Sequence, residues 1–99
     1  MKLDALVIAA HPDDAEISLG GTMLRMIRAG ARVGIVDLTR GELGSRGDRA
    51  SRDRETAAAN EILGVQVRHN LELPDGRVEP TLENRERLAR LVREHAPSV

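Results

Sequence analysis

The 99-residue sequence contains no cysteine and no phenylalanine, tyrosine or tryptophan. Without cysteine there are no disulfides and no thiolate metal sites, so a bound metal would have to be held by His, Asp or Glu. Without aromatic side chains the core must be built from Leu, Ile, Val, Ala and Met, which excludes the large area that aromatic residues bury. A domain this small already buries only a modest fraction of its surface, so we expect the chain to belong to a larger folding unit.

The sequence also lacks an excess of one charge and any long apolar run. Its formal net charge is -1, which favours neither a nucleic acid nor a membrane as partner. No apolar run is long enough to span a bilayer. The apolar stretch after Met1 runs into a charged cluster and not into a small-residue cleavage site, so it is unlike a signal peptide. These features predict a cytoplasmic protein and leave its oligomeric state open, a homo-oligomer included.

Apolar runs and helical periodicity alternate along the chain. We expect strands at 3–10, 32–38 and 65–69, and helices at 17–29, 52–63 and 81–95. The order strand, helix, strand, helix, strand, helix predicts parallel strands with right-handed crossovers, which is a Rossmann-like, doubly wound α/β sheet. The last residues, 97–99, are expected to enter a fourth strand. We therefore interpret residues 1–99 as the N-terminal part of a single domain.

A charged cluster, His11-Pro12-Asp13-Asp14, directly follows the first expected strand. Ligands of open α/β sheets bind outside the carboxyl ends of the strands. Pro12 is expected at the first helical position, and residues three apart near a helix start share one face, so His11 and Asp14 can converge. Imidazole and carboxylate both bind Zn²⁺, and Asp13 beside them can take a proton from a bound water. The structural alternative is that His11 caps the helix and the aspartates complement its dipole.

A third metal ligand is not evident from the sequence. His69 ends the third expected strand and could in principle reach the site, whereas His95 is expected to have a cationic or capping role at a helix end. Histidine with one carboxylate also describes a non-haem iron site, so Fe²⁺ stays open beside Zn²⁺.

The stretch from Ala10 to Glu16 resembles the signature of the LmbE-like or PIG-L deacetylases, which are zinc enzymes acting on N-acetylglucosamine conjugates. The resemblance continues in order along nearly the whole chain, through 20–22, 38–44, 52–55, 62–64 and 73–76. Within the family, the pattern is most similar to the branch that deacetylates N-acetylglucosaminyl malate in bacillithiol biosynthesis.

This resemblance implies that His11 and Asp14 bind zinc, that Asp13 is the general base and that Arg52 matches an arginine associated with substrate binding. The family takes its third zinc ligand from a later histidine-rich motif, which is absent from this sequence. We therefore expect the third ligand beyond Val99 and little activity from residues 1–99 alone. A small-molecule amino-sugar conjugate is the expected substrate.

The glycine-rich segment 40–54 carries a net excess of arginine, which suits bidentate recognition of a carboxylate such as malate. For its arginines other than Arg52, namely Arg40, Arg46, Arg49 and Arg54, a solvated polar loop is the preferred interpretation. Glu42 and Asp75 lie in motif-like loops near the expected site. Glu42 is a candidate for orienting substrate or a ligand, and Asp75 for holding its turn.

Two other functions fit the predicted fold. A nucleotide-binding module would use Asp37 at the end of the second strand, but Gly20 and Gly21 lie inside the helix, too late to cradle a pyrophosphate. A phosphoacceptor signalling domain would need an aspartate at the end of the third strand, where this chain has His69 and Asn70.

Overall fold

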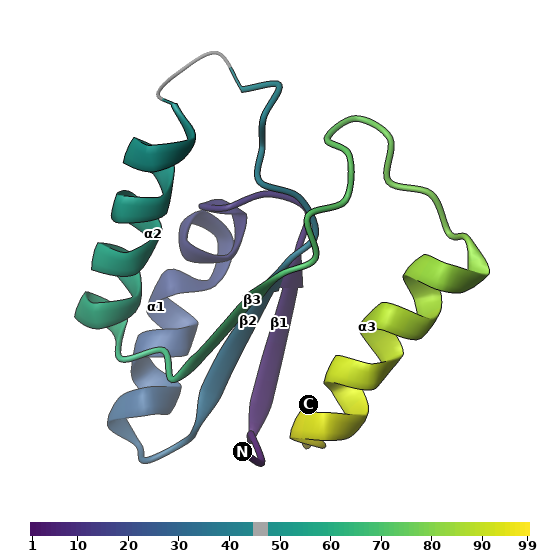
Figure 1. Ribbon diagram of the computed structural model, residues 1–99. Helices are drawn as coiled ribbons and strands as arrows, with labels where there is room; N and C mark the ends of the chain where they lie inside the picture. Colours follow the sequence, from purple (N-terminus) through teal and green to yellow (C-terminus); the bar gives the residue numbers. More distant parts are fainter. Residues whose placement is uncertain (45–47) are drawn as a thin grey trace.

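The structure is a computed structural model that describes residues 1–44 and 48–99 (Figure 1). Its strands are β1 (Ala5–Ala9), β2 (Val33–Asp37) and β3 (Val67–Asn70), and its helices are α1 (Asp14–Arg28), α2 (Arg49–Leu63) and α3 (Leu82–His95). The strands are parallel and lie in the order β1-β2-β3. The predicted α/β class with a parallel sheet is therefore confirmed.

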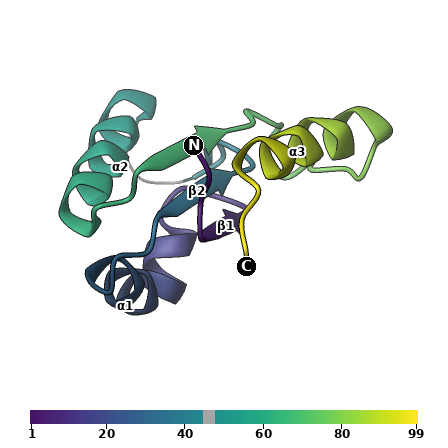
Figure 2. The ribbon, with the colours of Figure 1, turned by 90° about the horizontal axis from the view of Figure 1, so that it is seen from below.

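The helices cover both faces of the sheet, with α1 and α2 on one face and α3 on the other (Figures 1 and 2). Successive side chains of β2 point to opposite faces of the sheet and therefore pack into different layers. Ile35 is fully buried in the cluster that packs with α1, and Val36 is fully buried in the cluster that packs with α3. Leu88 and Leu91 of α3 contact that second cluster, as the apolar stripe of the helix predicts.

The chain changes sides of the sheet at β1. The helices α1 and α2 lead outward to β2 and β3, and α3 then returns over the opposite face (Figure 2). The last residue lies against the free edge of β1, where Val99 donates to the Asp4 carbonyl at 3.1 Å and accepts from the Leu6 N–H at 2.9 Å. The connections that leave β1 and return to it thus lie on opposite faces of the sheet (Figure 2), so the carboxyl end of β1 is a topological switch point, the usual place for a ligand site.

Two helices begin three residues earlier than the apolar pattern predicts. The helix α2 begins at Arg49 because Asp48 and Ser51 form a capping box, with the Asp48 carboxylate accepting from Ser51 N–H at 2.8 Å. The helix α1 begins at Asp14, with Asp13 as its N-cap residue. The prediction that Pro12 occupies the first helical position is therefore wrong, because Pro12 precedes the cap.

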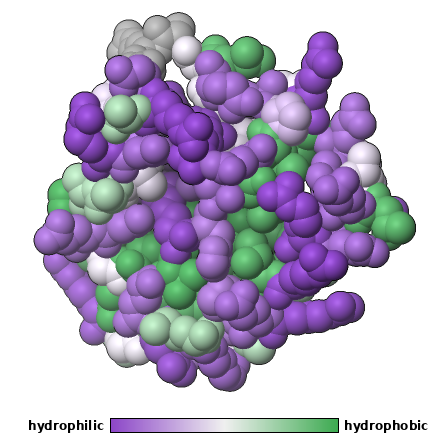
Figure 3. Space-filling model, in the orientation of Figure 1, coloured by the Kyte–Doolittle hydropathy of each residue, from purple (hydrophilic) through white to green (hydrophobic). Residues whose placement is uncertain are grey.

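Apolar side chains stay visible between the sheet and α3 on the face seen in Figure 3. Ile8 of β1, whose neighbour Val7 packs on the α1 side, is 45% exposed on the α3 side. One helix thus covers the α3 face less completely than two helices cover the other. In the part of the chain that the structure describes, no helix is both long and apolar enough to cross a membrane.

Candidate active site

His11 and Asp14 meet at the carboxyl end of β1. His11 lies just beyond the strand, and Asp14 is the first residue of α1. The His11 Nδ1 atom is 3.3 Å from Asp14 Oδ2, and the same carboxylate oxygen accepts the His11 backbone N–H at 3.1 Å. Both side chains are a little under half exposed, so they are accessible from solvent. The expected convergence of these two residues on one point is what the structure shows.

The spacing of these two atoms fits a metal site. Two ligands bound at about 2.0–2.1 Å to a tetrahedral zinc lie roughly 3.3–3.4 Å apart, which agrees with the 3.3 Å between His11 Nδ1 and Asp14 Oδ2. Within residues 1–44 and 48–99, no three His, Asp or Glu side chains are grouped to hold a metal. Among the described residues, His11 and Asp14 are therefore candidate ligands that cannot complete a metal site by themselves.

Asp13 has an unusual backbone conformation, with φ at 83° in the left-handed region. Its carbonyl accepts the Ile17 N–H at 2.8 Å, but among the described residues its carboxylate makes no capping hydrogen bond to α1. Asp tolerates this conformation better than most residues, yet such backbones concentrate at functional sites. Asp13 lines a cavity of about 430 Å³ together with His11 and Asp14. In the structural alternative, His11 would cap the helix; the N-cap residue is instead Asp13, while the acidic Asp14 and Glu16 of the first turn do complement the helix dipole.

Asp75 contacts the site from the turn after β3. Its Oδ1 accepts from His11 Nε2 at 2.7 Å, and its Oδ2 accepts from the Leu43 backbone N–H at 2.9 Å. The Asp75 side chain is only 8% exposed. The hydrogen bond with Asp75 raises the pKa of His11, while the Leu43 N–H and then His11 lower the pKa of Asp75. Sequence reasoning assigned Asp75 to its turn, although its place after a strand, at the edge that carries His11, signalled the site.

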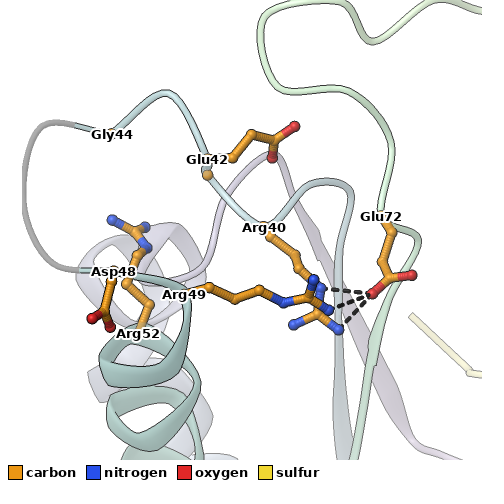
Figure 4. A pocket seen from close by; sticks show the side chains of 8 residues that line it. Arg40, Glu42, Gly44, Asp48, Arg49, Arg52 and Glu72 are labelled. Carbon is orange, nitrogen blue, oxygen red and sulfur yellow. Dashed lines mark hydrogen bonds and ion pairs between the residues drawn. The ribbon is translucent and has the colours of Figure 1, made fainter.

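Arg52 lies at the boundary between the site and a second cavity of about 480 Å³ (Figure 4). Its guanidinium packs against the loop that follows β2. A Cβ added at Gly41 would lie 2.9 Å from Arg52 Nη2, and one at Gly44 would lie 3.1 Å from Nη1. Gly41 also has a φ of 68°, so both space and conformation favour glycine there. These glycines allow the guanidinium to lie directly on the loop backbone.

The arginines around this second cavity differ in their partners. Arg40 and Arg49 both bond to Glu72 (Figure 4), and Arg40 also bonds to Asp53. In contrast, the buried Nε of Arg52 has no hydrogen-bond partner among the described residues. The sequence-based choice of Arg52 as a substrate-binding residue stays a prediction. Arg46 lies outside the described residues.

The other two histidines contact each other. His69 Nε2 is 3.0 Å from His95 Nε2, and His95 Nδ1 is 2.8 Å from the Met1 carbonyl. His95 is only 3% exposed, so it is a buried residue that joins α3 to β3 and to the start of the chain. The expected cationic or capping role of His95 is not what the structure shows, and the His69 ring is engaged with His95.

A doubly wound sheet with an imidazole, carboxylates and an arginine at its switch point is typical of α/β proteins that bind small ligands there. The profile of the GlcNAc-PI de-N-acetylase (PIG-L) family matches residues 6–99. The chain belongs to this family. The family assignment favours the hydrolase interpretation over the nucleotide-binding and phosphoacceptor alternatives.

Three similar proteins illustrate the family. A diacetylchitobiose deacetylase from Thermococcus kodakarensis is 33% identical over 95% of this chain and 38% of its own length. A 1D-myo-inositol 2-acetamido-2-deoxy-alpha-D-glucopyranoside deacetylase from Kineococcus radiotolerans is 42% identical over 72% of this chain and 23% of its own. The crystal structure of the conserved protein TT1542 from Thermus thermophilus superposes with a TM-score of 0.91 and 47% identity, over 96% of this chain and 43% of that one. The chain thus spans less than half the length of these proteins.

Proposed function

We propose that the complete protein is a zinc-dependent hydrolase that removes acetate from an N-acetylglucosaminyl conjugate. The observation that carries this proposal is the convergence of His11 Nδ1 and Asp14 Oδ2, 3.3 Å apart, at the switch point of the sheet. Two relatives are deacetylases of acetamido sugars by name. Because the chain spans only 38% of the first and 23% of the second, we place the third zinc ligand beyond Val99.

His11 and Asp14 would hold the metal, which when bound supplies an acidic water and polarises the acetamide carbonyl. Asp13 would accept a proton as the water attacks the carbonyl carbon, and the proton would then pass to the leaving amine, giving acetate and a free amino sugar. The carboxylate of Asp13 suits this role because it lines the same cavity and makes no capping bond to α1 within the described chain.

Arg52 would bind the part of the substrate that lies beyond the acetamido sugar. Among the described residues, the buried Nε of the Arg52 guanidinium has no hydrogen-bond partner, which is costly. Arginine matches a carboxylate in bidentate geometry, so a dicarboxylate aglycone such as malate fits. We therefore propose N-acetylglucosaminyl malate, the substrate of the bacillithiol branch, as the preferred conjugate.

Acetate release tests this proposal directly. The full-length protein should release acetate from N-acetylglucosaminyl malate, lose this activity with a chelator and regain it with Zn²⁺. N,N'-diacetylchitobiose, which lacks the aglycone carboxylates, should be a poorer substrate. The absence of acetate release from both compounds by zinc-loaded protein would overturn the proposed reaction. Equal rates with the two compounds would support a deacetylase but contradict N-acetylglucosaminyl malate as its preferred substrate. If Fe²⁺ and not Zn²⁺ restores activity, the metal assignment is wrong.

A further inference from the structure

The contact between His11 and Asp75 joins segments that are far apart in the sequence. Asp75 lies in the turn after β3, and its 2.7 Å bond to His11 Nε2 spans 64 residues. This bond is on the ring nitrogen that does not approach Asp14. The two nitrogens of one imidazole are thus divided between two carboxylates, and only the Asp14 carboxylate is a proposed metal ligand.

We infer that Asp75 is a positioning residue that fixes the orientation and tautomer of His11, so that Nδ1 is the nitrogen that binds the metal. This inference rests on the proposed metal site. An ionised carboxylate is only an acceptor, so Nε2 must carry the proton of this hydrogen bond. A neutral imidazole then has its lone pair on Nδ1, which faces Asp14. Metal-bound histidines commonly donate their second ring N–H to such a partner.

The Asp75 carboxylate is itself held in place. Oδ2 accepts the Leu43 backbone N–H at 2.9 Å while Oδ1 accepts from His11. The Asp75 backbone N–H donates to Glu42 Oε2 at 2.9 Å. Two bonds therefore join the turn after β3 to the loop after β2. A carboxylate that is buried and bonded at both oxygens has little freedom to rotate, which makes it a rigid support for the ring.

The competing explanation is that Asp75 only holds the two loops together and touches His11 incidentally. The chain offers a matched control, because Glu42 bridges the same two loops without a bond to His11. Replacing Asp75 by Asn leaves one acceptor oxygen for two donors and turns an NH₂ group toward either His11 or Leu43. Replacing Glu42 by Ala removes the bond to the Asp75 backbone and leaves the Asp75 carboxylate intact.

Zinc affinity of the full-length protein, measured by competition with a chromophoric chelator, tests the inference without a substrate. Asp75→Asn should weaken Zn²⁺ binding roughly 10–100-fold, the range known for such supporting groups. Glu42→Ala should bind Zn²⁺ within about twofold of wild type. Unchanged affinity in Asp75→Asn, or an equal loss in both variants, would overturn the inference while the proposed function stands. Wild-type protein that binds no zinc would overturn both.

A second measurement reads the tautomer of His11 in the wild-type protein itself. Nitrogen-15 NMR of the histidine rings in the zinc-loaded wild-type protein should show the His11 proton on Nε2 and the metal on Nδ1. His11→Gln, which should lose the signal, assigns it. A proton on Nδ1 with the metal on Nε2 would overturn the inference, whatever the affinities of the variants.

Discussion

Arg68 holds the Asp37 carboxylate at two points, with Nε 2.8 Å from Oδ2 and Nη2 3.1 Å from Oδ1. The same guanidinium donates to both oxygens of Glu16 at 3.2 Å and to Asn60 Oδ1 at 2.9 Å. All five N–H donors of the arginine are thus used. The side chains of Arg68 and Asp37 are 8% and 2% exposed. Burial raises the pKa of Asp37, and the hydrogen bonds from Arg68 oppose that rise.

This cluster anchors the start of α1, because Glu16 lies two residues after Asp14. Arg68→Met would leave the buried Asp37 and the partly buried Glu16 without a counter-charge, which should cost about 3–5 kcal/mol of unfolding free energy. Urea unfolding of the full-length protein measures the loss. Arg90→Met, an exposed position on α3, is the control and should change stability by less than about 0.5 kcal/mol. Similar midpoints for Arg68→Met and wild type would show that the cluster contributes little to stability.

The role of Asp13 can be separated from metal binding. Asp13→Asn should fold, because asparagine also tolerates the left-handed conformation at this position. It should keep zinc, because His11 and Asp14 are unchanged. Without a carboxylate to accept the proton, turnover should fall about 10²–10⁴-fold. Acetate release and bound zinc are measured on the same sample. His11→Ala should lose both, and an Asp13→Asn variant with near-normal turnover would exclude Asp13 as the base.

The fold was largely predictable because its signals are local. Apolar runs mark β1 and β2, Val65 and Val67 alternate with polar residues at β3, and alternation with helices implies a parallel sheet. The helix starts were less predictable, because the first turns of α1 and α2 are polar and give no apolar periodicity. The Asp48 and Ser51 capping box departs from the Ser/Thr-x-x-Glu/Gln pattern. The sequence therefore suggested that these two residues belong to a loop.

Only the part of the site that is formed by residues close together in the sequence could be predicted. His11 and Asp14 are three residues apart, so helix geometry alone brings them together. The contacts of Asp75 with His11 and of Arg68 with Glu16 span 64 and 52 residues. Such contacts depend on where the chain places the end of β3, which neither periodicity nor composition specifies. His95 was misjudged for the same reason, since its burial comes from β3 and Met1 and not from its own helix.

The proposed contact of Arg52 with a substrate carboxylate predicts an effect on KM. Arg52→Lys keeps the charge but loses the planar pair of donors. A charge-assisted bond is worth about 1.5–3 kcal/mol, so KM for N-acetylglucosaminyl malate should rise roughly 10–100-fold with little change in kcat. Zinc content should be unchanged. Arg54→Lys, an exposed neighbour on α2, is the control. A fall in kcat at constant KM would contradict a role in substrate binding.

The ion pair between Glu72 and Arg40 predicts a pH dependence of stability. Arg40 Nε donates to Glu72 Oε1 at 2.7 Å, and this hydrogen bond lowers the pKa of Glu72 below its ordinary 4.5. Because the folded value is the lower one, the stabilisation is fully present above the unfolded pKa and is lost as pH falls through the folded pKa. Glu72→Gln should therefore have a lower urea midpoint than wild type at pH 7, and the difference should shrink below about pH 4.

Comparing the stability of Glu72→Gln with that of wild type separates the effect of the Glu72 carboxylate from the effects of the other carboxylates. Asp48 and Asp75 also have lowered pKa values, so wild type and variant should both lose stability in acid, and only their difference reports Glu72. Both proteins are unfolded in urea at several pH values between 3 and 7. Glu61→Gln, an exposed position on α2, should follow wild type throughout. A difference between Glu72→Gln and wild type that stays constant down to pH 3 would show that the substitution acts through packing and not through the charge of Glu72.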